Sequence, residues 1–200
     1  MFDPQAFRSA LGSFVTGVTI VTARDGSGQP VGLTANSFNS VSLDPPMVLW
    51  SLSLNSGSLP VFRKAESWAV HVLAADQRPM SDRFATPGVD KFAGLDLADG
   101  PEGAPLLDGY AARFGCRAHF EYEGGDHAIF LGEVIDFDRR DADPLIYHSG
   151  RYARVAASEE RPLTGEDLER DGLAIRRAGG LELTGRGAEL LAALEALPRR

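Results

Sequence analysis

The chain has 200 residues, of which 44% are apolar and 24% are charged, and its formal net charge is -8. This length and composition predict a globular protein with one domain of ordinary size, and the charge argues against broad nucleic-acid binding and an anionic membrane surface. No stretch approaches the roughly 18 uninterrupted apolar residues of a membrane span. Met1-Phe2-Asp3-Pro4 and the residues after them show neither the basic nor the apolar region of a secretion signal, so none is expected. The single cysteine, Cys116, excludes an intrachain disulfide and favours a cytoplasmic location.

The first half of the chain predicts one helix followed by strands and short helices. Asp3 and Pro4 suit the N-cap and first residue of a helix that ends at Gly17, with one apolar face formed by Phe7, Ala10, Leu11 and Phe14. Short apolar runs between turn residues predict strands over residues 18–23, 31–35, 47–54 and 68–73. Short helices are expected over residues 58–66 and 76–85.

The second half predicts a long loop, a hairpin and a charged tail. Residues 86–109 are rich in Gly, Pro and Asp and read as a surface loop, and a strand pair is expected over residues 145–155. Between them, residues 112–122 and 127–138 predict a hairpin, with one apolar face on its first arm formed by Ala112, Phe114, Cys116, Ala118, Phe120 and Tyr122. Many short antiparallel strands with few helices predict a mainly β barrel with flanking helices.

The composition changes at about Ala156, so we expect a domain over residues 1–156 and a C-terminal helical extension or packing tail over residues 157–200. The tail is charged and rich in Gly, and it ends in an apolar stripe formed by Leu190, Leu191, Leu194 and Leu197.

Small, neutral polar residues gather along residues 31–58 and form the first candidate site. Their hydroxyl and amide groups both donate and accept hydrogen bonds, as a ring system with carbonyl and N–H groups on its edge requires. Ser56-Gly57-Ser58 precedes a helix and could meet a phosphate, although turns and caps also favour Ser and Asn. The candidate polar lining is Thr34, Asn36, Ser37, Ser51, Ser53, Ser56 and Ser58.

Other chemical signals are sparse. His127 opens a predicted strand and could contact a substrate or carry a proton, or be a solvated hairpin residue. Arg83-Phe84 and Lys91-Phe92 could hold a phosphate and stack on a ring, or be ordinary surface charges beside core aromatics. No spacing suggests a metal site, a P-loop, a Rossmann dinucleotide motif or a nucleophile elbow.

Taken in order, several segments resemble the flavin reductase-like family with the FMN-binding split barrel. The segments, which extend from Phe7 to about Val155, are Phe7–Thr19, Gly32–Phe38, Ser42–Pro46, Asp82–Phe84, Asp90–Gly94, Gly125–His127, Gly132–Val134 and Pro144–Tyr152. The resemblance implies a Greek-key antiparallel split barrel, FMN or FAD as the flavin, and usually a homodimer. Residues 181–197 are faintly similar to the last turn and helix of a winged-helix domain. Some members of the family carry such a domain at their C-terminus.

The resemblance also implies roles for individual residues. Thr34, Ala35, Asn36 and Ser37 would lie along the isoalloxazine and ribityl chain, and Ser51, Leu52 and Ser53 would line the ring. Ser56 and Ser58 would bind the phosphate, and His127 would lie beside the nicotinamide. The remaining predicted cofactor contacts are Phe84, Lys91, Phe92 and Tyr152. Ser149 stands where family members often carry Arg, which leaves the flavin and nicotinamide preferences open.

We therefore expect an NAD(P)H:flavin oxidoreductase that moves a hydride from NADH or NADPH to FMN or FAD and supplies reduced flavin to a partner monooxygenase. The chemistry would belong to the cofactors, which suits a site without a strong acid or base. The alternative is a flavin carrier or redox-sensing module without turnover. An oxidase of a phosphorylated substrate is disfavoured because residues 51–58 contain no Arg or Lys.

Overall fold

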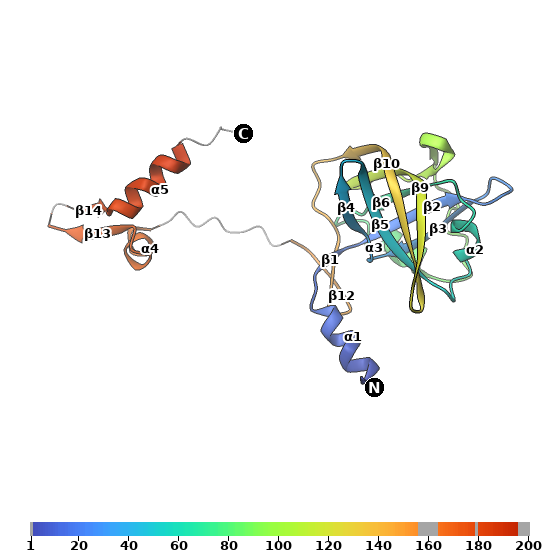
Figure 1. The fold of residues 1–200 in the computed structure, drawn as a ribbon, viewed down its shortest axis with the longest axis horizontal. Helices are drawn as coiled ribbons and strands as arrows, with labels where there is room; N and C mark the ends of the chain where they lie inside the picture. The colour runs from blue at the N-terminus through green and yellow to red at the C-terminus, as the bar shows by residue number, and fades with distance from the viewer. Residues whose placement is uncertain (1, 156–163, 179, 196–200) are drawn as a thin grey trace. The chain divides into compact units, whose positions relative to one another are not determined.

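The computed structural model describes residues 2–155, 164–178 and 180–195 (Figure 1). It divides the chain into two compact units, Met1–Val155 and Ala156–Arg200. Across the described ranges, no helix has both the length and the apolar character needed to cross a bilayer.

The first unit is built on a seven-stranded antiparallel sheet, which confirms the prediction of a mainly β fold with a few helices. Its strand order is β3-β2-β6-β9-β10-β5-β4. The strands are β2 (Thr19–Arg24), β3 (Pro30–Ala35), β4 (Asn39–Leu43), β5 (Pro46–Ser53), β6 (Ser67–Val72), β9 (Ala112–Gly124) and β10 (His127–Arg139). β4 had no counterpart among the predicted elements.

Two tryptophans occupy the centre of the core. Trp50 on β5 and Trp68 on β6 are both fully buried, and burial of side chains of this size stabilises the fold by a few kcal/mol each. The Trp50 ring stacks on Phe130 and meets Phe62 edge-on, with 4.9 Å between ring centroids in each pair. Gly132 lies against this cluster, and a Cβ atom there would stand 2.5 Å from the Trp68 ring.

The N-terminal helix is shorter than predicted. α1 (Pro4–Gly12) begins at the Asp3 cap, whose carboxylate accepts the backbone N–H groups of Gln5 and Ala6. The predicted end at Gly17 is wrong because residues 16 and 17 form β1 (Thr16–Gly17), which pairs with β11 (Ile146–His148). β12 (Arg151–Ala153) completes this small sheet, so the predicted strand pair over residues 145–155 is present.

The predicted hairpin of β9 and β10 is confirmed, but its apolar face is not continuous. The register skips His119, so Ala118 lies opposite Gly132 and Phe120 lies opposite Leu131. This β-bulge reverses the alternation of side chains and turns Phe120 and Tyr122 outward, where they are 47% and 53% exposed. The expectation that both residues share the face of Phe114 and Cys116 is therefore wrong.

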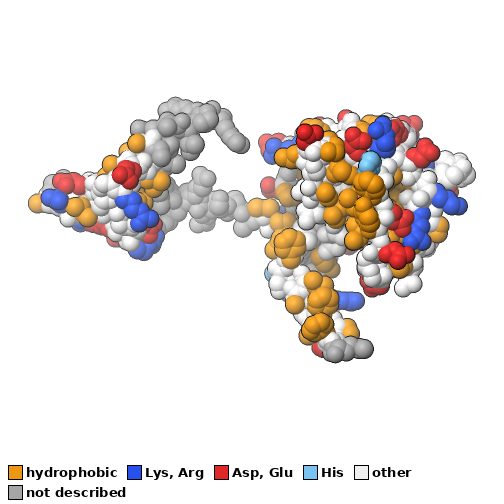
Figure 2. Space-filling model, viewed as in Figure 1, with side chains coloured by type: hydrophobic (Ala, Val, Ile, Leu, Met, Phe, Trp, Pro, Cys, Tyr) orange, Lys and Arg blue, Asp and Glu red, His pale blue; other side chains and the backbone are white. Residues whose placement is uncertain are grey.

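The bulge creates an apolar outer face on the sheet. Register and burial place Leu49 of β5, with Ile129 and Leu131 of β10, beside Phe120 and Tyr122. Figure 2 shows hydrophobic side chains gathered over this part of the first unit. We refer to these five residues as the outer face.

Residues 86–109 are more ordered than the predicted surface loop. They contain β7 (Ala98–Asp99), a 3-10 turn (Pro101–Gly103) and β8 (Pro105–Leu106), and Ala104, Leu106 and Leu107 are buried. His71 holds this segment in place because its Nε2 accepts the backbone N–H of Leu107 at 3.0 Å. The prediction erred because the few apolar residues at 104–107 become buried only when they pack on strands distant in sequence.

Two short helices flank the sheet. α2 (Leu59–Phe62) covers part of the predicted helix over residues 58–66, and α3 (Arg78–Ala85) agrees closely with the one predicted over residues 76–85. Leu59 and Phe62 of α2 and Phe84 of α3 are buried, so each helix contributes to the core.

The second unit contains α4 (Gly165–Arg170), β13 (Ala174–Arg177), β14 (Gly180–Leu183) and α5 (Gly185–Glu195), with β13 and β14 paired antiparallel. α5 carries Leu190 and Leu191 of the predicted stripe, which are 46% and 47% exposed, and Leu197 lies outside the described residues.

Candidate functional site

A small pocket opens where β3 ends, between α3 and the sheet of β11 and β12. We name it the Thr34 pocket, and its volume is about 220 Å³. This volume suits part of a cofactor rather than a complete nucleotide, because pockets for whole small molecules usually exceed about 300 Å³. Its lining consists of Val18, Thr34, Ala35, Asn36, Ser81, Ala85, Tyr147 and Tyr152.

Hydrogen bonds through Ser81 hold the walls of the Thr34 pocket together. The Thr34 hydroxyl donates to the Ser81 carbonyl at 2.7 Å, which ties β3 to α3. The Ser81 hydroxyl lies 3.0 Å from the Tyr152 hydroxyl, which in turn donates to an Asp82 carboxylate oxygen at 2.8 Å. Burial raises the pKa of Tyr152, so its hydroxyl keeps its proton at neutral pH.

A second cavity continues from the first and is named the α1 cavity. It has a volume of about 250 Å³ and shares Asn36 and Tyr147 with the Thr34 pocket. The Arg8 guanidinium lines it and has no ion pair within the described ranges. Its lining consists of Arg8, Leu11, Gly12, Phe14, Thr16, Asn36, Tyr147, Ser149 and Gly150.

Ser37 connects the loop after β3 to β5. Its hydroxyl donates to the Ser51 carbonyl and accepts the Ser51 backbone N–H, both at 2.9 Å. Ser51 and Ser53 are half-buried, whereas Leu52 between them is buried in the core, because side chains alternate along a strand. The structure thus separates the side chain of Leu52 from the two serines with which it was predicted to line a ring.

His127 lies at the start of β10, opposite Ser53 on β5. Its Nδ1 is 2.7 Å from an Asp126 carboxylate oxygen, and its side chain is 43% exposed. The hydrogen bond to His127 is the main reason that the pKa of Asp126 is lowered. His127 does not line the Thr34 pocket or the α1 cavity.

Ser56 and Ser58 lie in the turn between β5 and α2. The Ser58 N–H donates to the Ser56 hydroxyl at 3.3 Å, and the Ser58 side chain makes no capping bond to α2. Both residues are half-buried, and neither lines the two cavities.

Phe84, Lys91 and Phe92 meet at Gly32 of β3. Phe84 is fully buried and contacts Phe92 edge-on at 5.0 Å between centroids, so its ring is part of the core rather than of a cavity wall. A Cβ atom at Gly32 would stand 2.8 Å from Phe84, so only glycine fits beneath these rings. Lys91 Nζ donates to the Gly32 carbonyl at 3.2 Å, and partial burial lowers its pKa.

The sequence predicted Thr34, Ala35, Asn36 and Tyr152 as cofactor contacts, and the structure brings these four together in one pocket. It missed Ser81 and Tyr147, which line the same pocket, and Asp82, which holds Tyr152. Ser81 could have been noticed because it precedes Phe84 and Ala85 by three and four residues, which places a polar group on the buried face of the predicted helix.

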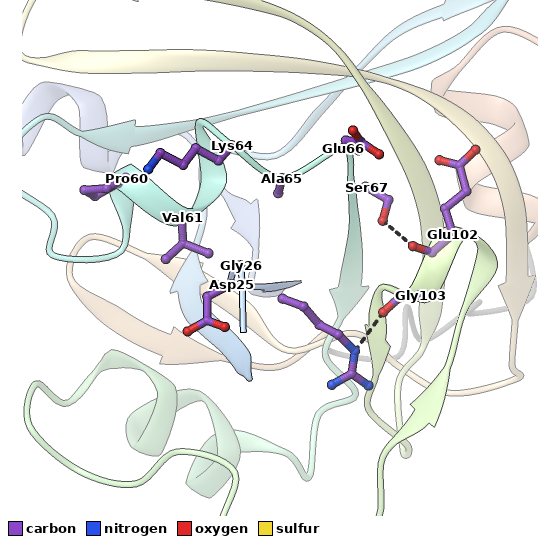
Figure 3. A pocket seen from close by; sticks show the side chains of 11 residues that line it. Asp25, Gly26, Pro60, Val61, Lys64, Ala65, Glu66, Ser67, Glu102 and Gly103 are labelled. Atoms are coloured by element: carbon purple, nitrogen blue, oxygen red, sulfur yellow. Dashed lines mark hydrogen bonds between the residues drawn. The ribbon is translucent and has the colours of Figure 1, made fainter. Parts of the chain in front are cut away.

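A larger cavity lies beyond the other end of β2 (Figure 3) and is named the Lys64 cavity. Its volume is about 450 Å³, and it contains none of the predicted site residues. Two of its polar groups already bond to its own wall, because Arg24 Nε donates to the Gly103 carbonyl and the Ser67 hydroxyl donates to the Glu102 carbonyl, both at 2.9 Å (Figure 3).

The flavin reductase like domain matches residues 11–156, a range that includes every residue of the Thr34 pocket. The chain belongs to this family. The chain is 48% identical over 154 residues to the FMN reductase (NADH) SmoA of Agrobacterium fabrum, covering 77% of this chain and 87% of the relative.

Other relatives differ in length and in their named roles. The reductase subunit HsaB of a flavin-dependent monooxygenase from Rhodococcus jostii is 37% identical, covering 82% of this chain and 85% of that protein. The NADH:FAD oxidoreductase SgcE6 of Streptomyces globisporus, solved with NAD and FAD fragments, has a TM-score of 0.74 at 39% identity, covering 80% and 99% of the two chains. The chain matches a longer probable flavin reductase of Rhizobium meliloti at 41% identity over 92% of its own length, and spans 61% of that relative.

Proposed function

We propose that the chain is an NAD(P)H:flavin oxidoreductase that acts on FMN or FAD. The observation that carries this proposal is the neutral polar lining of the Thr34 pocket, which contains hydroxyls, an amide and two tyrosine rings but no ionised group. Such a lining suits an uncharged planar ring and supplies no acid or base, and hydride transfer requires neither. The named activities of SmoA and SgcE6 support the same activity here.

A bound flavin would accept the hydride, and the residues of this chain would hold and orient it. Thr34, Ala35 and Asn36 would contact the ring and the ribityl chain in the Thr34 pocket. Ser37 would keep β5 beside them through its two hydrogen bonds to Ser51. Ser51 and Ser53 would extend the contact, and Ser56 and Ser58 would bind the phosphate.

His127 would position the nicotinamide rather than act as a base. Its exposed imidazole lies at a strand end and opposite Ser53, which is a predicted flavin contact. Lys91 carries a positive charge without a carboxylate partner in the described part of the chain, so it would attract a phosphate of either dinucleotide.

The chain would work as a homodimer, with the seven-stranded sheet curled into a split barrel. A second copy would cover the outer face and the apolar side of α1, where Phe7 and Leu11 are 55% and 60% exposed, together with Phe14 just beyond the helix, which is 72% exposed. The loop over residues 36–38 supports curling because it joins β3 and β4, which stand at the two ends of the sheet order, and Ser37 in this loop bonds to Ser51 of β5.

Reduced flavin would pass to a partner monooxygenase, as the name of the HsaB reductase subunit suggests for that protein. Residues 1–156 would carry the reductase activity. Residues 157–200 would be an accessory extension, which is supported by the division of the chain into two compact units.

The test is NADH or NADPH consumption by the purified chain with FMN, FAD or riboflavin, together with the absorption spectrum of any flavin it retains. We expect nicotinamide oxidation that depends on added or retained flavin. Retention of flavin without oxidation of either nicotinamide would instead identify a carrier or sensor.

A further inference from the structure

Hydrogen bonds fix the proton positions of three of the four hydroxyls in the Thr34 pocket, those of Thr34, Ser81 and Tyr152. Asp82 carries a carboxylate, which only accepts hydrogen bonds, so the Tyr152 hydroxyl must donate its single proton to it. The Ser81 hydroxyl, 3.0 Å from Tyr152, must then be the donor in that pair. The Thr34 hydroxyl uses its only proton in the hydrogen bond that it donates to the Ser81 carbonyl.

This arrangement leaves Thr34 and Tyr152 only lone pairs for a ligand, whereas the Asn36 amide and the Tyr147 hydroxyl line the same pocket and can still donate. Ser81 is fully buried and acts as the link, whereas Thr34 and Tyr152 are half-buried and line the pocket. Each of these two oxygens can accept another hydrogen bond but has no proton left to offer. A ligand carbonyl placed against them would meet an acceptor, and a ligand N–H or O–H would meet a partner.

We propose that the side of the Thr34 pocket formed by Thr34 and Tyr152 selects hydrogen-bond donors of the flavin and that Asp82 sets this preference by fixing the proton of Tyr152. The inference rests on the proposed flavin reductase function. Two parts of a flavin supply such donors, namely the ring imide N3–H and the ribityl hydroxyls. Asp82 does not line the pocket, so it is a positioning residue that acts through Tyr152.

The proposal distinguishes two substitutions that remove the same charge. Asp82→Asn keeps an oxygen that can accept the Tyr152 proton, so the donor preference is retained. Asp82→Ala removes the acceptor, so the Tyr152 proton is free to turn toward the pocket and the preference is lost. Asp76→Ala is the matched control, because Asp76 is an exposed carboxylate of the segment before α3 with no hydrogen bond or ion pair among the described residues.

The experiment measures dissociation constants by flavin fluorescence titration of the full-length chain and its variants. Riboflavin is compared with 3-methylriboflavin, which lacks the N3–H, and with lumiflavin, which lacks the ribityl hydroxyls. For the wild-type chain we expect about tenfold weaker binding of the analogue that lacks the recognised donor. Asp82→Asn and Asp76→Ala should keep this ratio, and Asp82→Ala should reduce it to about twofold or less.

Tyr152→Phe provides a second measure, because it removes the acceptor oxygen and keeps the ring. It should weaken riboflavin binding and abolish the same ratio. Equal ratios in the wild-type chain and in Asp82→Ala, or identical behaviour of Asp82→Ala and Asp82→Asn, would overturn the inference while leaving the function intact. Failure of the wild-type chain to bind any flavin would overturn the proposed function and the inference with it.

Discussion

The Thr34 pocket and the Lys64 cavity lie toward opposite ends of strand β2, and the smaller of the two is the better candidate site. The Lys64 cavity has about twice the volume, but ionisable groups of both signs line it, including Arg24, Lys64 and Glu66. The Thr34 pocket is neutral, and hydrogen bonds through Ser81 and Asp82 fix three of its four hydroxyls. Ordered neutral polar groups, and not volume, therefore distinguish the pocket that we propose as the flavin site.

Filling each cavity separately is the strongest test of this contrast. Ala35→Trp would occupy the Thr34 pocket with an indole ring, and we expect flavin binding to weaken by about 1,000-fold, equivalent to about 4 kcal/mol. Ala65→Trp in the Lys64 cavity should leave the dissociation constant within about twofold. Fluorescence titration measures both, and melting temperatures check that both variants fold. Equal losses would show that the two cavities cannot be distinguished in this way.

A neutral histidine contributes to the stability of β2, the strand between the two cavities. His71 is fully buried and lies with Nδ1 3.2 Å from the Ile20 carbonyl of β2, and burial lowers its pKa from 6.5 to about 4. Between these pH values the unfolded chain binds a proton that the folded chain excludes. The contribution of His71 to stability is therefore complete above pH 6.5 and is lost as the pH falls toward about 4, by up to about 3 kcal/mol.

Urea unfolding across this pH range measures the effect of His71. The slope of stability against pH should be smaller in His71→Gln than in the wild-type chain. His119→Gln is the control for the loss of a histidine, because His119 is exposed on β9 and lies outside the core. An unchanged slope in His71→Gln would contradict the assignment.

The role of His127 tests how far the site extends beyond the Thr34 pocket. His127→Ala should raise the KM for NADH or NADPH by about tenfold and change the flavin dissociation constant by less than about twofold, because the imidazole would contact only the nicotinamide. Steady-state kinetics and fluorescence titration separate the two effects. A loss of flavin affinity as large as the loss of nicotinamide use would contradict the positioning role.

The smallest expected effect compares two lysines near the two cavities. Lys91→Ala should weaken binding of FAD or NADH by about threefold, and this difference should shrink at high salt because a charge contact is screened. Lys64→Ala should change neither value, since Lys64 lines the Lys64 cavity. Calorimetric titration at two salt concentrations measures both variants. Equal effects of the two substitutions would remove Lys91 from the proposed site.

Local pattern was enough to predict most of the elements around the site. β-branched runs and turn residues predicted β2, β3, β5 and β6, because a strand can be recognised from the residue types of a short local segment. Alternation and the turn at residues 124–126 predicted the hairpin of β9 and β10. The bulge at His119 left no comparable pattern, so the outward turn of Phe120 and Tyr122 was missed.

The sequence by itself determined the strand-rich class of the fold, the family and the polar segment that ends at Thr34, Ala35 and Asn36. Only the tertiary structure joined Thr34 to Ser81, which follows it by 47 residues, and Ser81 to Tyr152, which follows Ser81 by 71 residues. It also buried Phe84 and Leu52 and placed His127 opposite Ser53. Local propensity depends on neighbours in sequence, whereas the direction of a proton between hydroxyls depends on packing, which brings distant segments within hydrogen-bond distance.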